Sequence, residues 1–331
     1  MRSLNETTFQ LNAETAPAWL AEHGLNPTDA PLVATELPGG VSASVVAVTG
    51  PGVAVLVKQA LRRLRVADTW EASVDRTETE VAALQLFGRL TPGVVPRVLA
   101  HDPADHVVAM ELLPPEARNW QAEIGEGRAW PELGRWAGET LGTWHSRTSG
   151  RPELADQFDT FHAFEELRLK PFHETVMKHR PELAEAVGVC LAELRAVRRC
   201  VVDGDYAPKN MLVAPDGRAW IFDLEVAHIG NPVFDLAFFL SFPVLSAVRW
   251  PNLTGELREL ADTFLVGYAD SGGDTIADDT ASVTAHTACL MLARTDGVSP
   301  AAFLDEAARE RARAVAIGLL GSPDEGLWSW L

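Results

Sequence analysis

The first third of the chain alternates short apolar runs with turn residues, a pattern typical of β-strands. It predicts strands over residues 31–37, 45–48, 53–59, 94–100 and 106–112. Residues 76–90 differ, because Val81, Leu84 and Phe87 recur at helical spacing and form one apolar face. We therefore expect a five-stranded antiparallel sheet and this helix, after a leader with a short helix near residues 16–23.

The rest of the chain is mainly helical. From residue 130 onward, Leu133, Leu141 and Trp144 follow helical spacing on one apolar face. Further helices are predicted over residues 158–176, 181–199, 255–270, 279–295 and 300–320. Pro171 should end or kink the first of these. The longest apolar run, residues 236–248, contains Pro243 and is too short to cross a bilayer, so we expect a buried helix there.

Residues 201–223 interrupt the helical part with three short apolar runs, a polar loop and a turn. The pattern predicts strands whose ends carry Asp205, Asn210 and Asp223. Asn210 and Asp223 offer an amide and a carboxylate oxygen, which suit Mg²⁺ beside phosphate oxygens. Asp205 then remains to orient a hydroxyl nucleophile or to accept its proton. Taken alone, aspartate and asparagine at these positions are equally consistent with ordinary turns.

Two features of the sheet region point to phosphate binding. Lys58 ends an apolar strand, where burial is costly unless a carboxylate or phosphate pairs with it; the alternative is a lysine whose ammonium reaches solvent. Glu78 and Glu80, near the start of the helix that follows, are possible partners, although the helix dipole also favours acids there. The turn containing Gly40 and Ser42 lets backbone amides approach a phosphate, but a simple hairpin has the same signature.

Three motifs in the second half of the chain resemble a known family. Gly-Asp-Tyr-Ala-Pro-Lys-Asn at residues 204–210 precedes Asp-Leu-Glu at 223–225 and Gly-Asn-Pro-x-x-Asp-Leu-Ala at 230–237. In order and spacing they resemble the aminoglycoside phosphotransferase and choline kinase-like family, and the resemblance covers most of the chain. It implies a protein kinase-like α+β fold. Residues 1–112 would form a nucleotide-binding sheet lobe, and residues 113–331 a mainly helical lobe with the catalytic loop and substrate cleft.

The resemblance implies transfer of the γ-phosphoryl group of ATP, with Mg²⁺, to a hydroxyl of a small molecule. Lys58 would hold the α- and β-phosphates, and Glu80, which best fits the family's spacing, would orient Lys58. A hinge near residues 111–115, including Glu111 and Leu113, would bind adenine through its backbone.

The same resemblance implies the catalytic roles. Asp205 would be the general base, Asn210 and Asp223 the magnesium ligands. Lys209 would neutralise charge on the moving phosphoryl group, and Glu225 would assist with metal or substrate.

Asp203 is the clear departure, because the family usually has histidine at this position. A third carboxylate near Asp205 and Asp223 repels them unless a cation offsets it. We expect Asp203 to accept backbone amides and leave activity intact; the alternative is a catalytically weak or inactive nucleotide-binding protein. Asp235 is expected to brace the catalytic loop.

Composition narrows the class of partner. The chain has 331 residues, 47% of them hydrophobic, and a net charge of −18, which argues against nucleic acid and anionic membranes. The charge suits solubility and, secondarily, a cationic substrate. Cys190, Cys200 and Cys289 lack metal-site spacing and, with a polar first ten residues, indicate a reduced cytoplasmic protein.

The sequence leaves the substrate open among an aminoglycoside, another amino sugar or amino alcohol, and a sugar. Lys-Gln-Ala at residues 58–60, with Arg65, Val66 and Trp70 after it, also resembles methylthioribose kinases. A protein kinase is disfavoured, because no Asp-Phe-Gly follows the catalytic loop and no Ala-Pro-Glu segment ends it. Acids that could meet a cationic substrate are Asp156, Asp159, Glu165 and Glu166.

Overall fold

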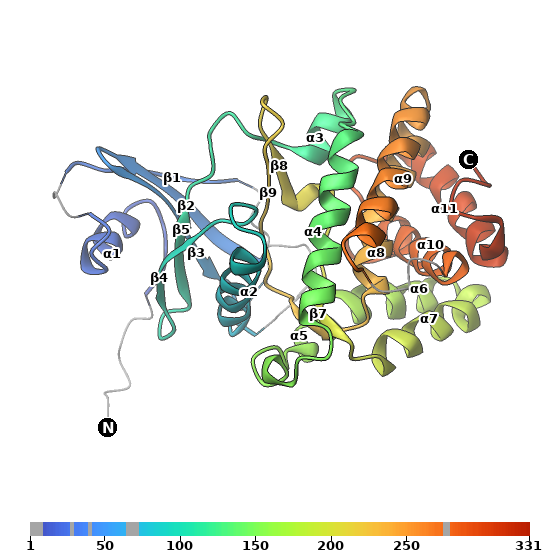
Figure 1. Cartoon of the computed structure of the whole chain (residues 1–331), viewed down its shortest axis with the longest axis horizontal. Helices are drawn as coiled ribbons and strands as arrows, with labels where there is room; N and C mark the ends of the chain where they lie inside the picture. Colours follow the sequence, from blue (N-terminus) through green and yellow to red (C-terminus); the bar gives the residue numbers. More distant parts are fainter. Residues whose placement is uncertain (1–8, 27–29, 39–41, 64–72, 274–278) are drawn as a thin grey trace.

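The computed structural model of the chain describes residues 9–26, 30–38, 42–63, 73–273 and 279–331. A part built around a sheet lies on the left of Figure 1 and a larger body of helices on the right. This confirms the predicted α+β class. Gly40, Arg65, Val66 and Trp70, all named above, lie outside the described residues. The lobe boundary between residues 112 and 113 stays a prediction; it falls just after a strand of the sheet.

The sheet is antiparallel and has five strands in the order β1-β2-β3-β5-β4. The strands and their two flanking helices are α1 (Ala16–Glu22), β1 (Val33–Glu36), β2 (Ala43–Gly50), β3 (Val53–Ala60), α2 (Arg76–Leu90), β4 (Val98–Asp102) and β5 (Val107–Glu111).

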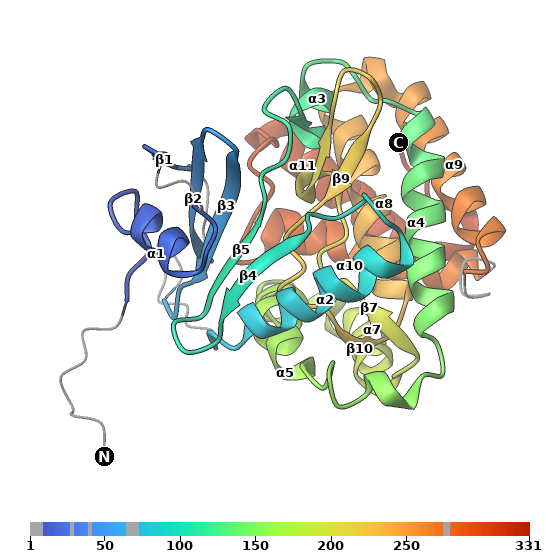
Figure 2. The ribbon, with the colours of Figure 1, turned by 60° about the vertical axis from the view of Figure 1, so that its left-hand side comes forward.

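The side chains of β5 show how the alternation of the strands builds two hydrophobic layers. Val107 and Ala109 pack with residues of α1 on the outer face of the sheet. Val108 and Met110 face the opposite way and join the main core together with residues of α2. The sheet is therefore sandwiched between α1 and α2, and α2 lies between the sheet and the helical part (Figure 2).

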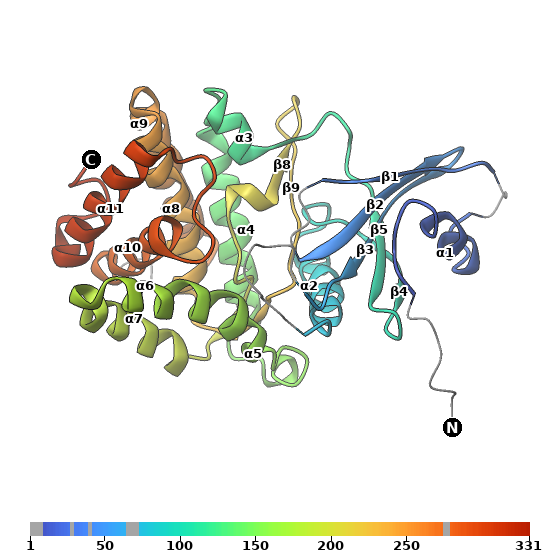
Figure 3. The same cartoon turned by 180° about the vertical axis from the view of Figure 1, so that it is seen from behind.

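The helical part surrounds α8, in which every residue except Arg249 is buried and which tolerates the interior residue Pro243. Seen from behind, α6, α7, α10 and α11 form the face of the helical part that is turned toward the reader (Figure 3). The helices of this part are α3 (Trp120–Gly125), α4 (Glu132–Thr148), α5 (Phe161–Phe164), α6 (Thr175–His179), α7 (Ala184–Ala196), α8 (Val233–Arg249), α9 (Thr254–Asp270), α10 (Thr280–Asp296) and α11 (Glu306–Gly321).

Close packing of α4 against α9 depends on a row of glycines. Gly134, Gly138 and Gly142 recur every fourth residue and therefore share one face of α4. A Cβ at Gly138 would collide with the backbone of Phe264, and the two other glycines face α9 backbone in the same way. Because glycine has no side chain, the backbones of α4 and α9 come into direct contact.

Two small sheets frame the loops that carry the predicted catalytic residues. β7 pairs with β10, and β8 lies between β6 and β9. Residues 203–210 connect β7 to β8, so Asp205 and Asn210 lie between the two sheets. The strands are β6 (Arg118–Asn119), β7 (Cys200–Val202), β8 (Met211–Val213), β9 (Ala219–Ile221) and β10 (His228–Gly230).

The single helix predicted over residues 158–176 is not what forms. A short α5 passes into a π-helical segment, Glu165–Glu174, which continues into α6. Pro171 lies inside that segment rather than ending it, because wider turns relax the clash that its ring makes in an α-helix. Among the residues that the structure describes, no helix has the length and apolar character required to cross a membrane.

Candidate active site

Asp235 holds the start of the catalytic loop through the backbone. Its two carboxylate oxygens accept hydrogen bonds from the amides of Asp203 and Gly204, at 2.7 and 2.8 Å. Gly204 has a φ of +78°, which permits the sharp turn before Asp205. His145 lies 3.1 Å from Asp235 Oδ2, and its other ring nitrogen lies 3.0 Å from the Tyr268 hydroxyl. Asp235 and the buried His145 therefore brace the loop, as the sequence predicted for Asp235.

Asp205 is surrounded by groups that hold its carboxylate in place. Lys209 Nζ and Asn210 Nδ2 both donate to Oδ2, the latter at 2.6 Å. Arg168 Nη2 lies 3.0 Å from Oδ1, and its Nε donates to the carbonyl of Gly204. Because Asn210 uses its amide nitrogen here, its Oδ1 is left to accept a cation. Sequence reasoning missed Arg168, since its segment shows no motif and only the π-helical turn brings it to the loop.

Asp203 is buried and turned toward the loop backbone. Its Oδ1 accepts a hydrogen bond from the amide of Asp205 at 3.1 Å, which is the arrangement expected from the sequence. Burial raises the pKa of the Asp203 carboxyl well above its usual value, and the charges of Asp235 and Asp205 add to this effect. A protonated Asp203 carries no charge, so it does not repel the other carboxylates of the site.

Lys58 lies between two carboxylates from different parts of the chain. Its Nζ is 2.8 Å from Glu80 Oε1 on α2 and 2.5 Å from Asp223 Oδ1 after β9. Burial alone would lower the pKa of Lys58, but Asp223 and Glu80 outweigh it and hold the pKa above its usual value. The nearer partner is Asp223: burial opposes its ionisation, yet Lys58 lowers its pKa to about 2. Burial raises the pKa of Glu80 to about 7 against the pull of Lys58.

Asp223 has a φ of +68°, in the left-handed region that residues other than glycine rarely adopt. The preceding amide, of Phe222, donates to the carbonyl of Asn210 at 3.0 Å, which sets the two predicted ligands on adjacent strand ends. A strained residue of this kind is typical of a functional position. Glu78, the other candidate partner of Lys58, instead lies 2.9 Å from His101 Nε2.

Glu225 is held by an arginine that the sequence did not single out. Arg76, at the start of α2, lies with Nε 3.1 Å from Glu225 Oε2. Its guanidinium also donates to the carbonyls of Ser42, Leu61 and Ser73, at 2.5, 2.6 and 2.6 Å. Arg76 thus ties the ends of β2 and β3 to the segment after Asp223, and it occupies the carboxylate that was expected to assist with metal or substrate.

A cavity of about 940 Å³ brings the predicted residues together. Its apolar end lies against β2, β3 and β5, where Val45, Leu56 and Met110 form its walls. Its polar middle and far end are lined by side chains from the catalytic strands, the π-helical segment and α10. The predicted site residues in the lining are Ser42, Lys58, Glu80, Glu111, Leu113, Asp205, Lys209, Asn210, Asp223 and Glu225.

The oxygen donors of the cavity suit Mg²⁺ bound together with phosphate oxygens better than a metal ion bound by side chains alone. Asn210 and Asp223 supply hard oxygens on neighbouring strand ends. No group of three or more histidine, cysteine or acidic side chains able to hold a metal occurs in the described part of the chain. That composition matches Mg²⁺, which is usually bound by one or two side chains together with phosphate oxygens.

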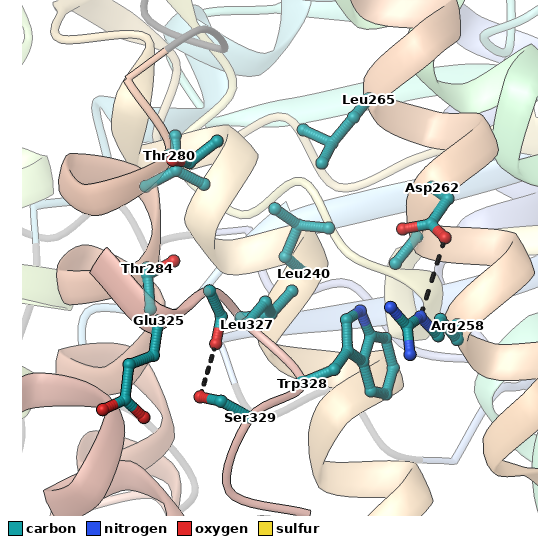
Figure 4. A pocket seen from close by; sticks show the side chains of 13 residues that line it. Leu240, Arg258, Asp262, Leu265, Thr280, Thr284, Glu325, Leu327, Trp328 and Ser329 are labelled. Carbon is teal, nitrogen blue, oxygen red and sulfur yellow. Dashed lines mark hydrogen bonds and ion pairs between the residues drawn. The ribbon is translucent and has the colours of Figure 1, made fainter. Parts of the chain in front are cut away.

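A second cavity, of about 390 Å³, lies among α9, α10 and the C-terminal segment (Figure 4). Leu240, Leu265 and Trp328 form its apolar walls. Its charged pair, Arg258 and Asp262, is exposed and 3.9 Å apart. None of the predicted catalytic residues lines this cavity.

The acids suggested to meet a cationic substrate do not line the larger cavity. Glu165 instead lies 2.8 Å from Arg195 on α7. Asp156 and Asp159 are exposed, and Glu166 is half-buried outside the lining. These side chains are solvated or structural, because the π-helical turn directs Leu167, Arg168 and Phe172 into the cavity in their place.

Comparison with known proteins agrees with this geometry. Residues 33–278 match the phosphotransferase enzyme family. The chain is 24% identical to a methylthioribose kinase from Bacillus velezensis, over 76% of this chain and 74% of that protein.

Solved structures show the same fold at low identity. An ethanolamine kinase from Plasmodium vivax superposes with a TM-score of 0.57 and 10% identity, covering 97% of this chain and 98% of that one. A macrolide 2′-phosphotransferase from Brachybacterium faecium gives 0.53 and 19%, covering 91% and 97%. The resemblance inferred from the motifs is thereby confirmed. The chain belongs to the phosphotransferase enzyme family, and it is a phosphotransferase that acts on a hydroxyl of a small molecule.

Proposed function

We propose that this enzyme transfers the γ-phosphoryl group of ATP, with Mg²⁺, to a substrate hydroxyl bound beside Asp205. The observation that carries the proposal is Lys58, which bonds to both Glu80 and Asp223 in the cavity that also contains Asp205. One cation shared by two carboxylates is a preorganised site for phosphate, because a phosphate can replace one of them.

The nucleotide end of the cavity has an assigned role for each polar group. Lys58 would bind the α- and β-phosphates while Glu80 keeps it oriented. The backbone near Glu111 and Leu113 would bind adenine beside the apolar walls, and the turn at Ser42, with Gly40, would cover the phosphates. Asn210 and Asp223 would hold Mg²⁺, which when bound supplies positive charge to the phosphate oxygens.

At the other end, Asp205 would orient the substrate hydroxyl and accept its proton as the oxygen attacks phosphorus. Arg168 and Lys209 hold this carboxylate in position. Lys209 would also neutralise part of the negative charge on the phosphoryl group during its transfer. Asp203 supports the loop through the Asp205 amide, which favours an active enzyme over a catalytically inactive binding protein.

The acceptor is a small molecule, and two classes are considered: sugars, and amino sugars or amino alcohols. Sugars are favoured by the relationship to a methylthioribose kinase. Amino sugars and amino alcohols were expected from the overall charge of −18. Among the described residues, however, each acid that lines the cavity is already paired with a base, which gives a cationic substrate no evident partner.

The experiment is ATP consumption with Mg²⁺ against a panel of methylthioribose, ribose, gluconate, an aminoglycoside, glucosamine, choline and ethanolamine. We expect ADP release that depends on both the metal and one acceptor, and a phosphorylated product. ATP binding in a thermal shift, without turnover on any hydroxyl, would instead support an inactive nucleotide-binding protein. Asp216→Asn, in an exposed turn after β8, serves as a control for the loss of an aspartate outside the cavity.

A further inference from the structure

The acceptor end of the large cavity is built by three segments distant in sequence. The π-helical segment contributes Arg168 and Phe172, α8 contributes Phe238, and α10 with the residues after it contributes Arg294 and Ser299. The amide of Val298 donates to the carbonyl of Pro171 at 3.2 Å, which fastens the last of these segments to the first. This end therefore combines two aromatic walls with two arginines.

Arg294 differs from Arg168 in having no carboxylate partner among the residues that the structure describes. Its Nη1 donates to the carbonyl of Ser299 at 2.6 Å, which anchors one side of the guanidinium. Nε has no hydrogen-bond partner, and Nη2 bonds to none of the described residues. No described carboxylate forms an ion pair with Arg294, although the side chain is half-buried. Because Nε is also shut off from solvent, Nη2 is the donor that remains for a ligand.

Partial removal of a cation from water without a counter-ion costs free energy, which a ligand of opposite charge can offset. Burial lowers the pKa of Arg294 to about 10, partly offset by the charge of Asp205 and reinforced by that of Arg168. The guanidinium stays protonated at neutral pH, so it remains able to bind an anion.

The acids around the cavity, unlike Arg294, have ion-pair partners in the described part of the chain. Glu80 and Asp223 share Lys58, and Glu225 is bound to Arg76. Asp205 has Arg168 and Lys209 as partners. Each acid of the described lining thus has an ion-pair partner, whereas Arg294, at the acceptor end, has none among the described residues.

We propose that the acceptor of this phosphotransferase carries a carboxylate, which binds Nη2 of Arg294 while its hydroxyl lies at Asp205. The inference rests on the proposed function and specifies its substrate class. Phe172 and Phe238 enclose the carbon skeleton between these two polar ends. A guanidinium without a counter-ion forms a charge-assisted hydrogen bond with a carboxylate oxygen.

Three compounds with one carbon skeleton test the charge directly: gluconate, sorbitol and glucamine, which differ in a carboxylate, an alcohol or an ammonium group at one end. ADP release with Mg²⁺ and ATP would be measured for each, together with product formation by ³¹P NMR. We expect kcat/KM for gluconate to exceed that of the other two by roughly tenfold to a hundredfold, the range for a hydrogen bond to a charged group. Preference for sorbitol or glucamine would overturn the inference while leaving the phosphotransferase assignment intact.

Variants of Arg294 separate substrate binding from other roles. Arg294→Gln should raise KM for gluconate on the order of tenfold or more and leave kcat and the sorbitol kinetics nearly unchanged. Arg294→Lys, which keeps the charge, should recover part of the loss. Arg258→Gln, at an exposed arginine of the second cavity, should change neither parameter.

Other outcomes contradict the inference in distinct ways. An equal fall in kcat for all three compounds in Arg294→Gln would assign Arg294 to the phosphoryl group of ATP. Unchanged gluconate kinetics would remove Arg294 from the acceptor site. If no compound is phosphorylated, titration calorimetry of gluconate with the ATP-bound enzyme decides, because absence of saturable binding overturns the inference even when the enzyme binds ATP. Melting temperature and ATP affinity would confirm that each variant is folded.

Discussion

Arg76→Met would test the buried link between α2 and the segment after Asp223. Arg76 is 2% exposed and Glu225 6%, so the pair is shielded from water. Removing the guanidinium leaves the Glu225 carboxylate without this partner and takes a donor from the carbonyls of Ser42, Leu61 and Ser73. Breaking a buried ion pair from one side typically costs about 3–5 kcal/mol of unfolding free energy. That is a large share of a total that is usually about 5–15 kcal/mol.

The reverse variant should be milder. Glu225→Gln keeps an oxygen that can accept from Arg76 Nε, and Arg76 retains its three carbonyl acceptors. We therefore expect a loss of about 1.5–3 kcal/mol, the range for one charge-assisted hydrogen bond. In the double variant neither charge remains, so the total cost should fall short of the sum by about 0.5–3 kcal/mol.

Urea unfolding of the four proteins at pH 7, followed by fluorescence and circular dichroism, measures this cycle. Nearly equal m-values would show that the same transition is compared. A cost below about 1 kcal/mol for Arg76→Met would contradict a buried ion pair between Arg76 and Glu225, and so would additive costs of the two single variants. Either result would mean that water screens the pair. Glu225→Gln should also keep the magnesium dependence of ATP binding, since its carboxylate is engaged by Arg76.

Three further changes address individual groups of the site. Lys58→Met should weaken ATP binding and turnover, with exposed Lys178→Met as control; wild-type values for both would make Lys58 a structural strand-end lysine. Asp223→Ala should abolish the magnesium-dependent part of ATP affinity, and an unchanged magnesium titration would contradict its role as ligand. Burial raises the pKa of Asp203, so the contribution of this carboxyl to the unfolding free energy should fall as pH rises above the unfolded value of about 3.9. Asp203→Asn should therefore gain more unfolding free energy over wild type at pH 8 than at pH 5, and an equal gain at both would contradict this.

Much of the fold follows from local patterns in the sequence. The apolar face of Val81, Leu84 and Phe87 predicts α2 with the bounds that the structure has. The strands were placed within a few residues, because glycine and proline mark their ends. The buried helix α8 could be inferred from its apolar run, although Pro243 lies within it.

The parts that could not be predicted depend on contacts between distant segments. Nothing in the sequence near Arg168 indicates a π-helical turn, yet that turn brings its guanidinium to Asp205. Arg76 looks like any first-turn arginine until the ends of β2 and β3 surround it. The motif spacing predicts that Lys58 pairs with Glu80 rather than Glu78. The packing of α2 against β3 is what brings Lys58 and Glu80 together.

The most direct test is single-turnover transfer of the γ-phosphoryl group to the acceptor by wild type and by Asp205→Asn, with ATP affinity measured in parallel. The variant should bind ATP as the wild type does and transfer phosphate roughly 10²- to 10⁴-fold more slowly, the usual loss for a general base. Asp216→Asn should behave as wild type, because its carboxylate is exposed and lies outside the cavity. Transfer at the wild-type rate by Asp205→Asn would contradict the assignment of this cavity as the phosphotransferase active site.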